Sequence, residues 1–189
     1  MVPEAKPVTD DALLGRKVGG YTITRRVGQG GMGVVYEAKH ALMDKRAAVK
    51  VLHKELSADQ KLLQRFLNEA KASSAAHHSS IVSIFEYGQL EDGTAFIMME
   101  FLDGEPLLTR MEKAQKADSL LPLRLVVELV RQLAAALAVI HQKGIIHRDL
   151  KPENIFVVPD SVAPLGERVK LLDFGIAKVL DGKARKTTV

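Results

Sequence analysis

A glycine-rich segment near the start of the sequence limits the folds that are open to this chain. Residues 28–33 read Gly-Gln-Gly-Gly-Met-Gly, and the segments on either side are rich in β-branched and aromatic residues. The pattern G-x-G-x-x-G lets backbone amides approach phosphate groups closely, although it also occurs in ordinary turns. A dinucleotide-binding fold needs the pattern to open a helix, whereas a strand-like segment follows here. A P-loop is excluded because Val34, not lysine, follows Gly33.

The rest of the first half predicts a small antiparallel sheet and one helix. Ser57 and Gln60 have the spacing of a capping box, so we expect Ser57 to cap the helix that follows. On that helix Glu69 falls on the same face as Phe66, where a carboxylate needs a cation. The expected strands are residues 21–24, 34–38, 47–52, 81–87 and 94–101.

The second half predicts one long helix and two short strands. Pro122 opens a segment with apolar residues at helical spacing, and Gly144 ends it. Residues 155–158 and 169–172 read as strands, separated by a loop that contains proline. Residues 1–20 mix proline, glycine and charge without periodicity, so we expect a flexible leader there.

Composition narrows the class of protein. The 189 residues are 47% hydrophobic, which suffices for a well-packed core, and the net charge of +4 is not gathered in a basic stripe. We therefore expect no nucleic-acid partner. The absence of cysteine excludes disulfides and thiolate metal sites. With no export signal, and with the most apolar window (133–140) far too short to cross a membrane, the prediction is a cytoplasmic protein without a membrane segment in this chain.

Five motifs occur in a fixed order: "GQGGMGVVYEA", "AAVK", a helix carrying Glu69, "HRDLKPEN" and "DFG". In this order they resemble the serine/threonine protein kinase family, and the form "GGMGVVY" resembles its bacterial (Hanks-type) branch. The resemblance implies an α+β, protein-kinase-like two-lobed fold, with a complete β-rich N-lobe plus helix and an incomplete helical C-lobe. The implied boundaries are an N-lobe at 21–99, a hinge at 100–104, and a partial C-lobe at 105–189 that ends in the activation segment.

The resemblance also implies a reaction, the transfer of the γ-phosphate of MgATP to serine or threonine hydroxyls of a protein substrate. Lys50 would hold the α- and β-phosphates and pair with Glu69, where the alternative is two unrelated surface charges. Asp149 would orient the substrate hydroxyl and accept its proton. Lys151, the residue typical of enzymes that act on serine and threonine, would stabilise the transferring phosphoryl group.

The remaining implied sites bind magnesium and the nucleotide. Asn154 and Asp173 would supply oxygen ligands to Mg²⁺. Met99 occupies the gatekeeper position, although it is equally an ordinary core residue. The other implied contacts of ATP are Gly28, Gly30, Gly33, Val35, Ala48, Glu100, Leu102 and Phe156.

By the same resemblance the sequence ends inside the activation segment, where Thr187 or Thr188 would be an autophosphorylation site facing Arg148. Two hypotheses of different classes follow. One is a protein serine/threonine kinase. The other is a truncated, non-catalytic module that binds ATP or regulates another kinase as its dimer partner.

Overall fold

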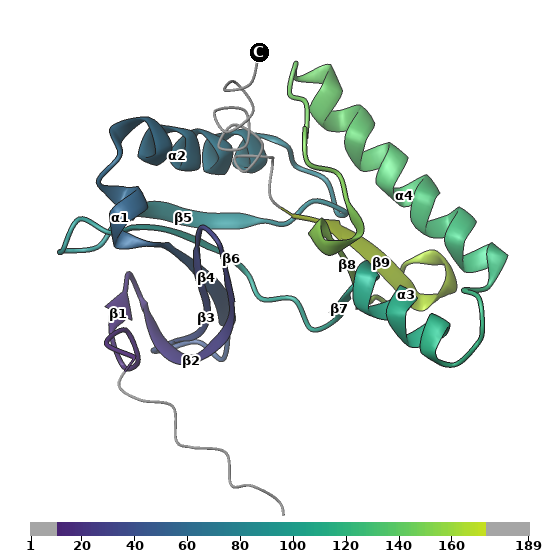
Figure 1. Cartoon of the computed structure of the whole chain (residues 1–189), viewed down its shortest axis with the longest axis horizontal. Helices are drawn as coiled ribbons and strands as arrows, with labels where there is room; N and C mark the ends of the chain where they lie inside the picture. The colour runs from purple at the N-terminus through teal and green to yellow at the C-terminus, as the bar shows by residue number, and fades with distance from the viewer. Residues whose placement is uncertain (1–10, 173–189) are drawn as a thin grey trace, which may run out of the picture.

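Six antiparallel strands form a curled sheet in the first half of the chain, in the order β1-β2-β3-β4-β6-β5 (Figure 1). The computed structural model describes residues 11–172, apart from the side chains at positions 69, 72 and 75. Each strand has alternating side chains, so the sheet can bury apolar residues on both faces. The strands are β1 (Lys17–Val18), β2 (Tyr21–Gly30), β3 (Gly33–His40), β4 (Arg46–Leu52), β5 (Ile84–Gln89) and β6 (Ala95–Glu100).

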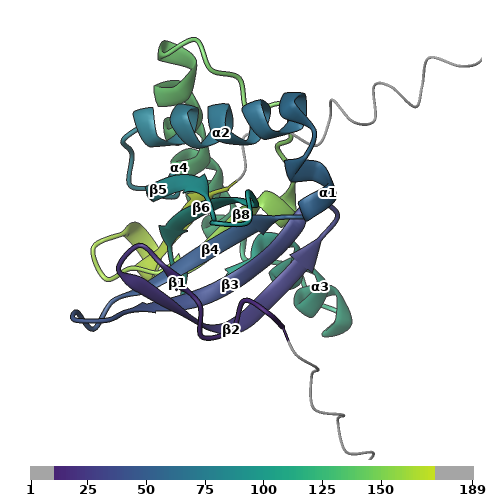
Figure 2. The ribbon, with the colours of Figure 1, turned by 90° about the vertical axis from the view of Figure 1, so that its left-hand side faces the viewer.

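The two faces of this sheet have separate cores. Tyr36, Val49 and Met98 belong to a cluster that fills the inside of the curl. On the other face, Ile97 packs with Phe66 of helix α2 (Gln60–Ala75), which lies along the sheet as Figure 2 shows. The helix that carries position 69 is therefore fixed against the strands of the N-lobe.

The start of α2 differs from the predicted capping box. Asp59 is the N-cap, and its Oδ1 accepts hydrogen bonds from the backbone amides of Lys61 (2.8 Å) and Leu62 (3.2 Å). Ser57 instead ends the short helix α1 (Lys54–Ser57), and its Oγ accepts a bond from the amide of Ala95 in the sheet. The prediction for Ser57 was wrong because the helix begins two residues later, where the carboxylate of Asp59 caps it.

Part of the expected leader is built into the sheet. Strand β1 pairs with β2, and the amide of Ile23 donates to the carbonyl oxygen of Arg16 (2.9 Å). Leu13 packs against the cluster inside the curl, and the hydroxyl of Tyr36 donates to Asp11 Oδ1 (2.9 Å). Residues 11–20 thus pack on the sheet of the N-lobe, and the domain boundary at residue 20 stays a prediction.

As far as residue 172, the second lobe combines a small sheet with two α-helices (Figure 1). The long helix begins after Pro122 and ends before Gly144 as predicted, and Gly144 has the positive φ (72°) that favours glycine after a helix. Its buried side packs on the sheet through Leu129 and Ile140, whereas Val130 on the predicted apolar stripe is exposed. The elements are β7 (Glu105–Pro106), α3 (Leu107–Lys116), α4 (Leu123–Gln142), β8 (Ile155–Pro159) and β9 (Glu167–Leu171), with 3-10 turns at Pro152–Asn154 and Pro164–Gly166.

The segment between α2 and β5 joins the two lobes. Ile81 forms a parallel bridge with Leu171 of β9, and the backbone of Leu171 is bonded to both Ser80 (2.8 Å) and Val82 (3.1 Å). The strand predicted from residue 81 therefore begins only at Ile84. In the described part of the chain, every helix is too short or too polar to pass through a lipid bilayer.

Candidate active site

The loop at 147–154 brings three of the predicted catalytic and metal-binding side chains together. Asn154 Nδ2 donates hydrogen bonds to the backbone carbonyl oxygen and to Oδ2 of Asp149, both at 2.9 Å. Lys151 Nζ lies 3.3 Å from the same Oδ2. Arg148 adopts a positive φ (63°), a costly conformation for a residue with a side chain, so the loop turns sharply just before Asp149. Asp149 is thereby held by two neighbours from its own loop.

This loop is also fixed to the end of β9. His147 is 2% exposed, and its Nε2 donates to the carbonyl oxygen of Leu172 (2.7 Å). The amide of Leu172 donates to the carbonyl oxygen of Asn154 (2.9 Å). Both backbone groups of the residue before Asp173 are therefore bonded to the loop. Asp173 itself lies outside the described residues, as do Thr187 and Thr188.

The glycines of the predicted phosphate-binding hairpin have two different roles. A Cβ at Gly28 or Gly30 would meet no heavy atom within 4 Å, so this stretch of backbone presents an open surface. A Cβ at Gly33 would lie 2.1 Å from the carbonyl oxygen of Val51, so Gly33 is required for the packing of β3 on β4. A contact of Gly33 with the nucleotide stays a prediction.

Lys50, Val35 and Ala48 lie on one face of the N-lobe sheet. Lys50 of β4 is directly opposite Val35 of β3, and Ala48 is opposite Met99 of β6. Residues opposite each other, or two apart on one strand, share a face of a sheet. The side chains of these three residues, which are predicted to contact ATP from the N-lobe, therefore lie on the same face of the sheet. The pairing of Lys50 with Glu69 stays a prediction, because the side chain of Glu69 is not described.

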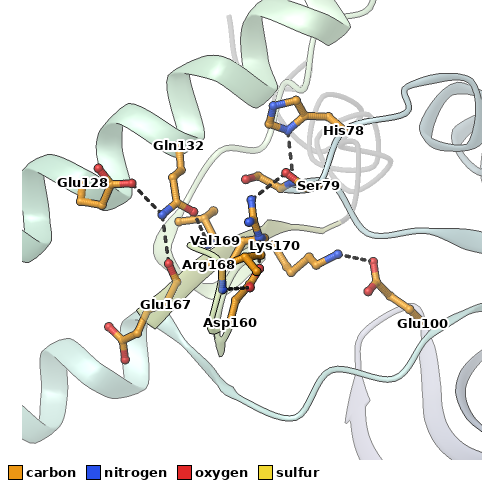
Figure 3. A network of polar contacts seen from close by, with 12 residues as sticks. His78, Ser79, Glu100, Glu128, Gln132, Asp160, Glu167, Arg168, Val169 and Lys170 are labelled. Atoms are coloured by element: carbon orange, nitrogen blue, oxygen red, sulfur yellow. Dashed lines mark hydrogen bonds and ion pairs between the residues drawn. The ribbon is translucent and has the colours of Figure 1, made fainter. Parts of the chain in front are cut away.

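The hinge is attached to strand β9 of the second lobe by a side-chain contact of Glu100. The carboxylate of Glu100 accepts a hydrogen bond from Lys170 Nζ at 2.7 Å (Figure 3). It also accepts a hydrogen bond from the amide of Ser83 at 2.7 Å. The Glu100 amide in turn donates to the Ser83 carbonyl oxygen (2.9 Å). The Glu100 side chain therefore anchors the hinge to β9. These contacts also fix the backbone of Glu100, which is the first residue of the segment predicted to bind adenine.

Phe156, the adenine contact predicted for the second lobe, lies in β8. It is opposite Lys170 in the β8–β9 pair, so these two side chains share a face. The neighbouring residues Ile155 and Val157 are buried against α4 on the other face. Since Lys170 reaches the hinge, Phe156 belongs to the face of the C-lobe sheet that carries the hinge contact.

A second set of side-chain contacts joins the turn after α2 to β9, and the sequence did not predict it. Arg168 bonds to Asp160 and, through Nη1, to Ser79 Oγ at 2.7 Å (Figure 3). Burial, together with the nearby cations Arg168 and Lys170, lowers the pKa of His78. Its Nδ1 accepts a hydrogen bond from the Ser80 amide (3.1 Å), which requires a neutral ring nitrogen. The turn after α2 is thus tied to β9 by side chains that lie far away in the sequence.

Asn154 also fits the predicted magnesium ligand set. Both described bonds of its side chain use the amide nitrogen, so the Oδ1 atom is directed away from Asp149. A neutral amide oxygen is a suitable ligand for a hard cation. Among the described residues no cluster of three histidine or acidic side chains forms an alternative metal site.

A curled sheet with a glycine hairpin, one hinge segment, and a loop that combines Asp149, Lys151 and Asn154 define the protein-kinase-like class of two-lobed folds. Residues 21–189 match the family described as protein kinase domain, and the chain belongs to that family.

Three of the similar proteins come from bacteria. The chain is 42% identical to the serine/threonine-protein kinase Pkn1 of Myxococcus xanthus over 98% of its own length and 26% of that protein. It is 37% identical to PknA of Mycobacterium tuberculosis over 86% of its length and 36% of that protein. The crystal structure of the M. tuberculosis PknI kinase domain matches with a TM-score of 0.71 at 32% identity, over 86% of this chain and 61% of that one. The chain thus spans about a quarter to a third of the length of these curated relatives.

Proposed function

We propose that this chain carries the ATP site of a cytoplasmic serine/threonine protein kinase, which transfers the γ-phosphate of MgATP to a hydroxyl of a protein substrate. The observation that carries the proposal is the contact of Asp149 with both Asn154 and Lys151. Phosphoryl transfer depends mainly on positioning and on charge stabilisation, and these three side chains supply both.

Asp149 would act on the substrate hydroxyl. Its Oδ2 atom receives the contacts of Asn154 and Lys151 within the described residues, so Oδ1 is the oxygen that would accept the hydroxyl proton. The carboxylate cannot rotate without losing these contacts, and a fixed acceptor holds the hydroxyl in line with the phosphorus atom. The ammonium group of Lys151 lies beside the carboxylate, where it would stabilise negative charge on the transferring phosphoryl group.

Magnesium ions would neutralise the phosphate oxygens of ATP. Asn154 Oδ1 would hold one ion, and Asp173 would provide the carboxylate ligand. The bonds from Leu172 to His147 and Asn154 support this role, because they join the residue before Asp173 to the loop that carries Asn154.

The nucleotide would lie between the two lobes. The open backbone at Gly28 and Gly30 would approach the phosphates, and Lys50 would hold the α- and β-phosphates. Val35 and Ala48 would cover the adenine ring from the N-lobe, and Phe156 from the C-lobe. The backbone of Glu100 and Leu102 would hydrogen-bond the adenine edge.

Isothermal calorimetry of MgATP binding, combined with a phosphate-transfer assay on a generic basic protein, tests the proposal. We expect the full chain to bind MgATP saturably and Lys50→Met to weaken binding at least tenfold. Asp149→Asn should keep MgATP affinity and lose transfer, since Asp149 contacts the hydroxyl and not the nucleotide. Lys116→Met, at the exposed end of α3, is the matched control. Binding without transfer would favour the non-catalytic ATP-binding module, and absence of binding would overturn both.

A further inference from the structure

A buried carboxylate in the N-lobe sheet organises two arginines beside the hinge. Glu37 of β3 is 5% exposed. Arg25 Nε lies 2.6 Å from its Oε2 atom, and Arg46 Nη1 lies 3.8 Å from its Oε1 atom. A buried carboxylate is stable only when it is paired, so Glu37 holds both guanidinium groups near the start of β4.

Arg46 extends from this pair to the hinge. Its Nη2 atom forms an ion pair with the carboxylate of Asp103. Its guanidinium carbon lies 4.5 Å from the centre of the Phe101 ring, and that of Arg25 lies 5.9 Å from the same ring. Both distances allow a cation–π attraction. One side chain of β4 therefore contacts two residues of the hinge.

These contacts flank the hinge residue predicted to bind adenine. Phe101 and Asp103 lie on either side of Leu102, whose backbone would hydrogen-bond the base. The next residue, Gly104, is fixed from the C-lobe, because a Cβ there would lie 2.3 Å from the carbonyl oxygen of Val157. Position 102 is thus held by Arg46 on one side and by the packing of Gly104 on the other.

We propose that Arg46 is a positioning residue that fixes the hinge backbone for adenine, a role that rests on the proposed ATP site. Exposed ion pairs usually contribute little, and the side chain of Asp103 is 67% exposed. Arg46 differs from an ordinary surface arginine because Glu37 already orders its guanidinium group, which lowers the entropy cost of the contacts with Asp103 and Phe101.

Binding of two ligands separates this role from a general effect on the fold. Calorimetry on the full chain gives the dissociation constants of MgATP and of adenosine, which has the base and no phosphates. We expect Arg46→Met and Asp103→Asn to weaken both ligands by a similar factor of about three to ten, the scale of one exposed ion pair with a cation–π contact. Lys50→Met, in contrast, should weaken MgATP and leave adenosine unchanged.

Three further variants complete the comparison. Arg46→Lys should give an intermediate loss, because a point charge cannot contact Glu37 and Asp103 as the forked guanidinium does. Lys39→Met is the matched control: Lys39 is opposite Arg46 in the sheet, is exposed, and its side chain forms no hydrogen bond or ion pair within residues 11–172. The double variant Arg46→Met/Asp103→Asn should lose less than the product of the two single losses.

The outcomes distinguish a positioning role of Arg46 from a general effect of the substitutions on the fold. Unchanged adenosine affinity in both Arg46→Met and Asp103→Asn would overturn the positioning role, as would equal losses in Lys39→Met. Urea unfolding of each variant shows whether it is folded at the assay temperature. If Arg46→Met is unfolded, Asp103→Asn carries the test, because it leaves the Glu37 pairs intact. Failure of the wild-type chain and of Lys39→Met to bind either ligand would overturn the proposed ATP site itself.

Discussion

The side chain of Asn154 divides its two functional groups between two tasks. Its amide nitrogen donates to the backbone carbonyl oxygen and to Oδ2 of Asp149, both at 2.9 Å, and this leaves Oδ1 for a cation. A single residue would thus connect the position of the proton acceptor to the position of the metal. An aspartate at this site could bind a metal but could not donate to Asp149, and an alanine could do neither.

A pair of variants at this position tests that division. Asn154→Asp loses both donated bonds and places a second carboxylate beside Asp149, so we expect phosphate transfer to fall by about 10²- to 10³-fold, the scale seen when one positioned donor is removed. The magnesium concentration needed for half-maximal rate should change little in Asn154→Asp and rise in Asn154→Ala. Single-turnover transfer rates at several magnesium concentrations give both quantities. Equal magnesium dependence in the two variants would contradict the metal role of Oδ1.

The glycine hairpin offers a second matched pair. Gly33→Ala places a Cβ 2.1 Å from the Val51 carbonyl oxygen, so β3 and β4 must separate, and we expect the free energy of unfolding to fall by about 2 to 4 kcal/mol. Gly30→Ala meets no protein atom within 4 Å and should leave stability within about 0.5 kcal/mol of wild type. Urea unfolding measures both. Gly30→Ala should still weaken MgATP binding, because its new methyl group stands where a phosphate would approach. Normal MgATP affinity in Gly30→Ala would show that this backbone is not near the nucleotide.

Gln132 should be important for the stability of the C-lobe. It is 4% exposed on α4, accepts a hydrogen bond from the Val169 amide (2.9 Å) and donates to the Glu167 carbonyl oxygen (3.0 Å). Gln132→Leu keeps the side-chain volume but leaves these two backbone groups of β9 without their hydrogen-bond partner. This loss should lower the free energy of unfolding by about 2 to 4 kcal/mol. Gln142→Leu, at the exposed end of the same helix, should have little effect. A loss below about 1 kcal/mol in Gln132→Leu, measured by urea unfolding, would mean that water replaces the side chain.

Local patterns predicted much of this molecule. Lys50 sits in a strand as its β-branched neighbours indicate, and Asp149, Lys151 and Asn154 meet because five consecutive peptide units hold them in one turn. Gly144 ends the long helix because only glycine readily takes the conformation that follows it. Such features depend on neighbours in the sequence, so the sequence alone contains them.

Features that depend on distant partners were missed. Nothing near Glu37 in the sequence indicates that this residue pairs with Arg25 and Arg46. Ile81 looks like the start of a strand, yet its partner is Leu171, 90 residues later. Ser57 had the right spacing for a helix cap, but its Oγ atom instead accepts a hydrogen bond from the amide of Ala95 in the sheet. In each case tertiary contacts decided between local alternatives of similar energy.

Tyr36 gives a prediction on alkaline stability. Burial raises its pKa to about 12, and the hydrogen bond to Asp11 adds to the effect. An unfolded tyrosine titrates near pH 10, so the folded state binds more protons between about pH 10 and pH 12. The contribution of this group is complete below pH 10 and is lost as the pH rises toward 12, by about 2 kcal/mol. Tyr36→Phe should flatten this part of the stability profile, measured by urea unfolding from pH 8.5 to 11.5. Parallel profiles for wild type and Tyr36→Phe would show that folding does not raise the pKa of Tyr36.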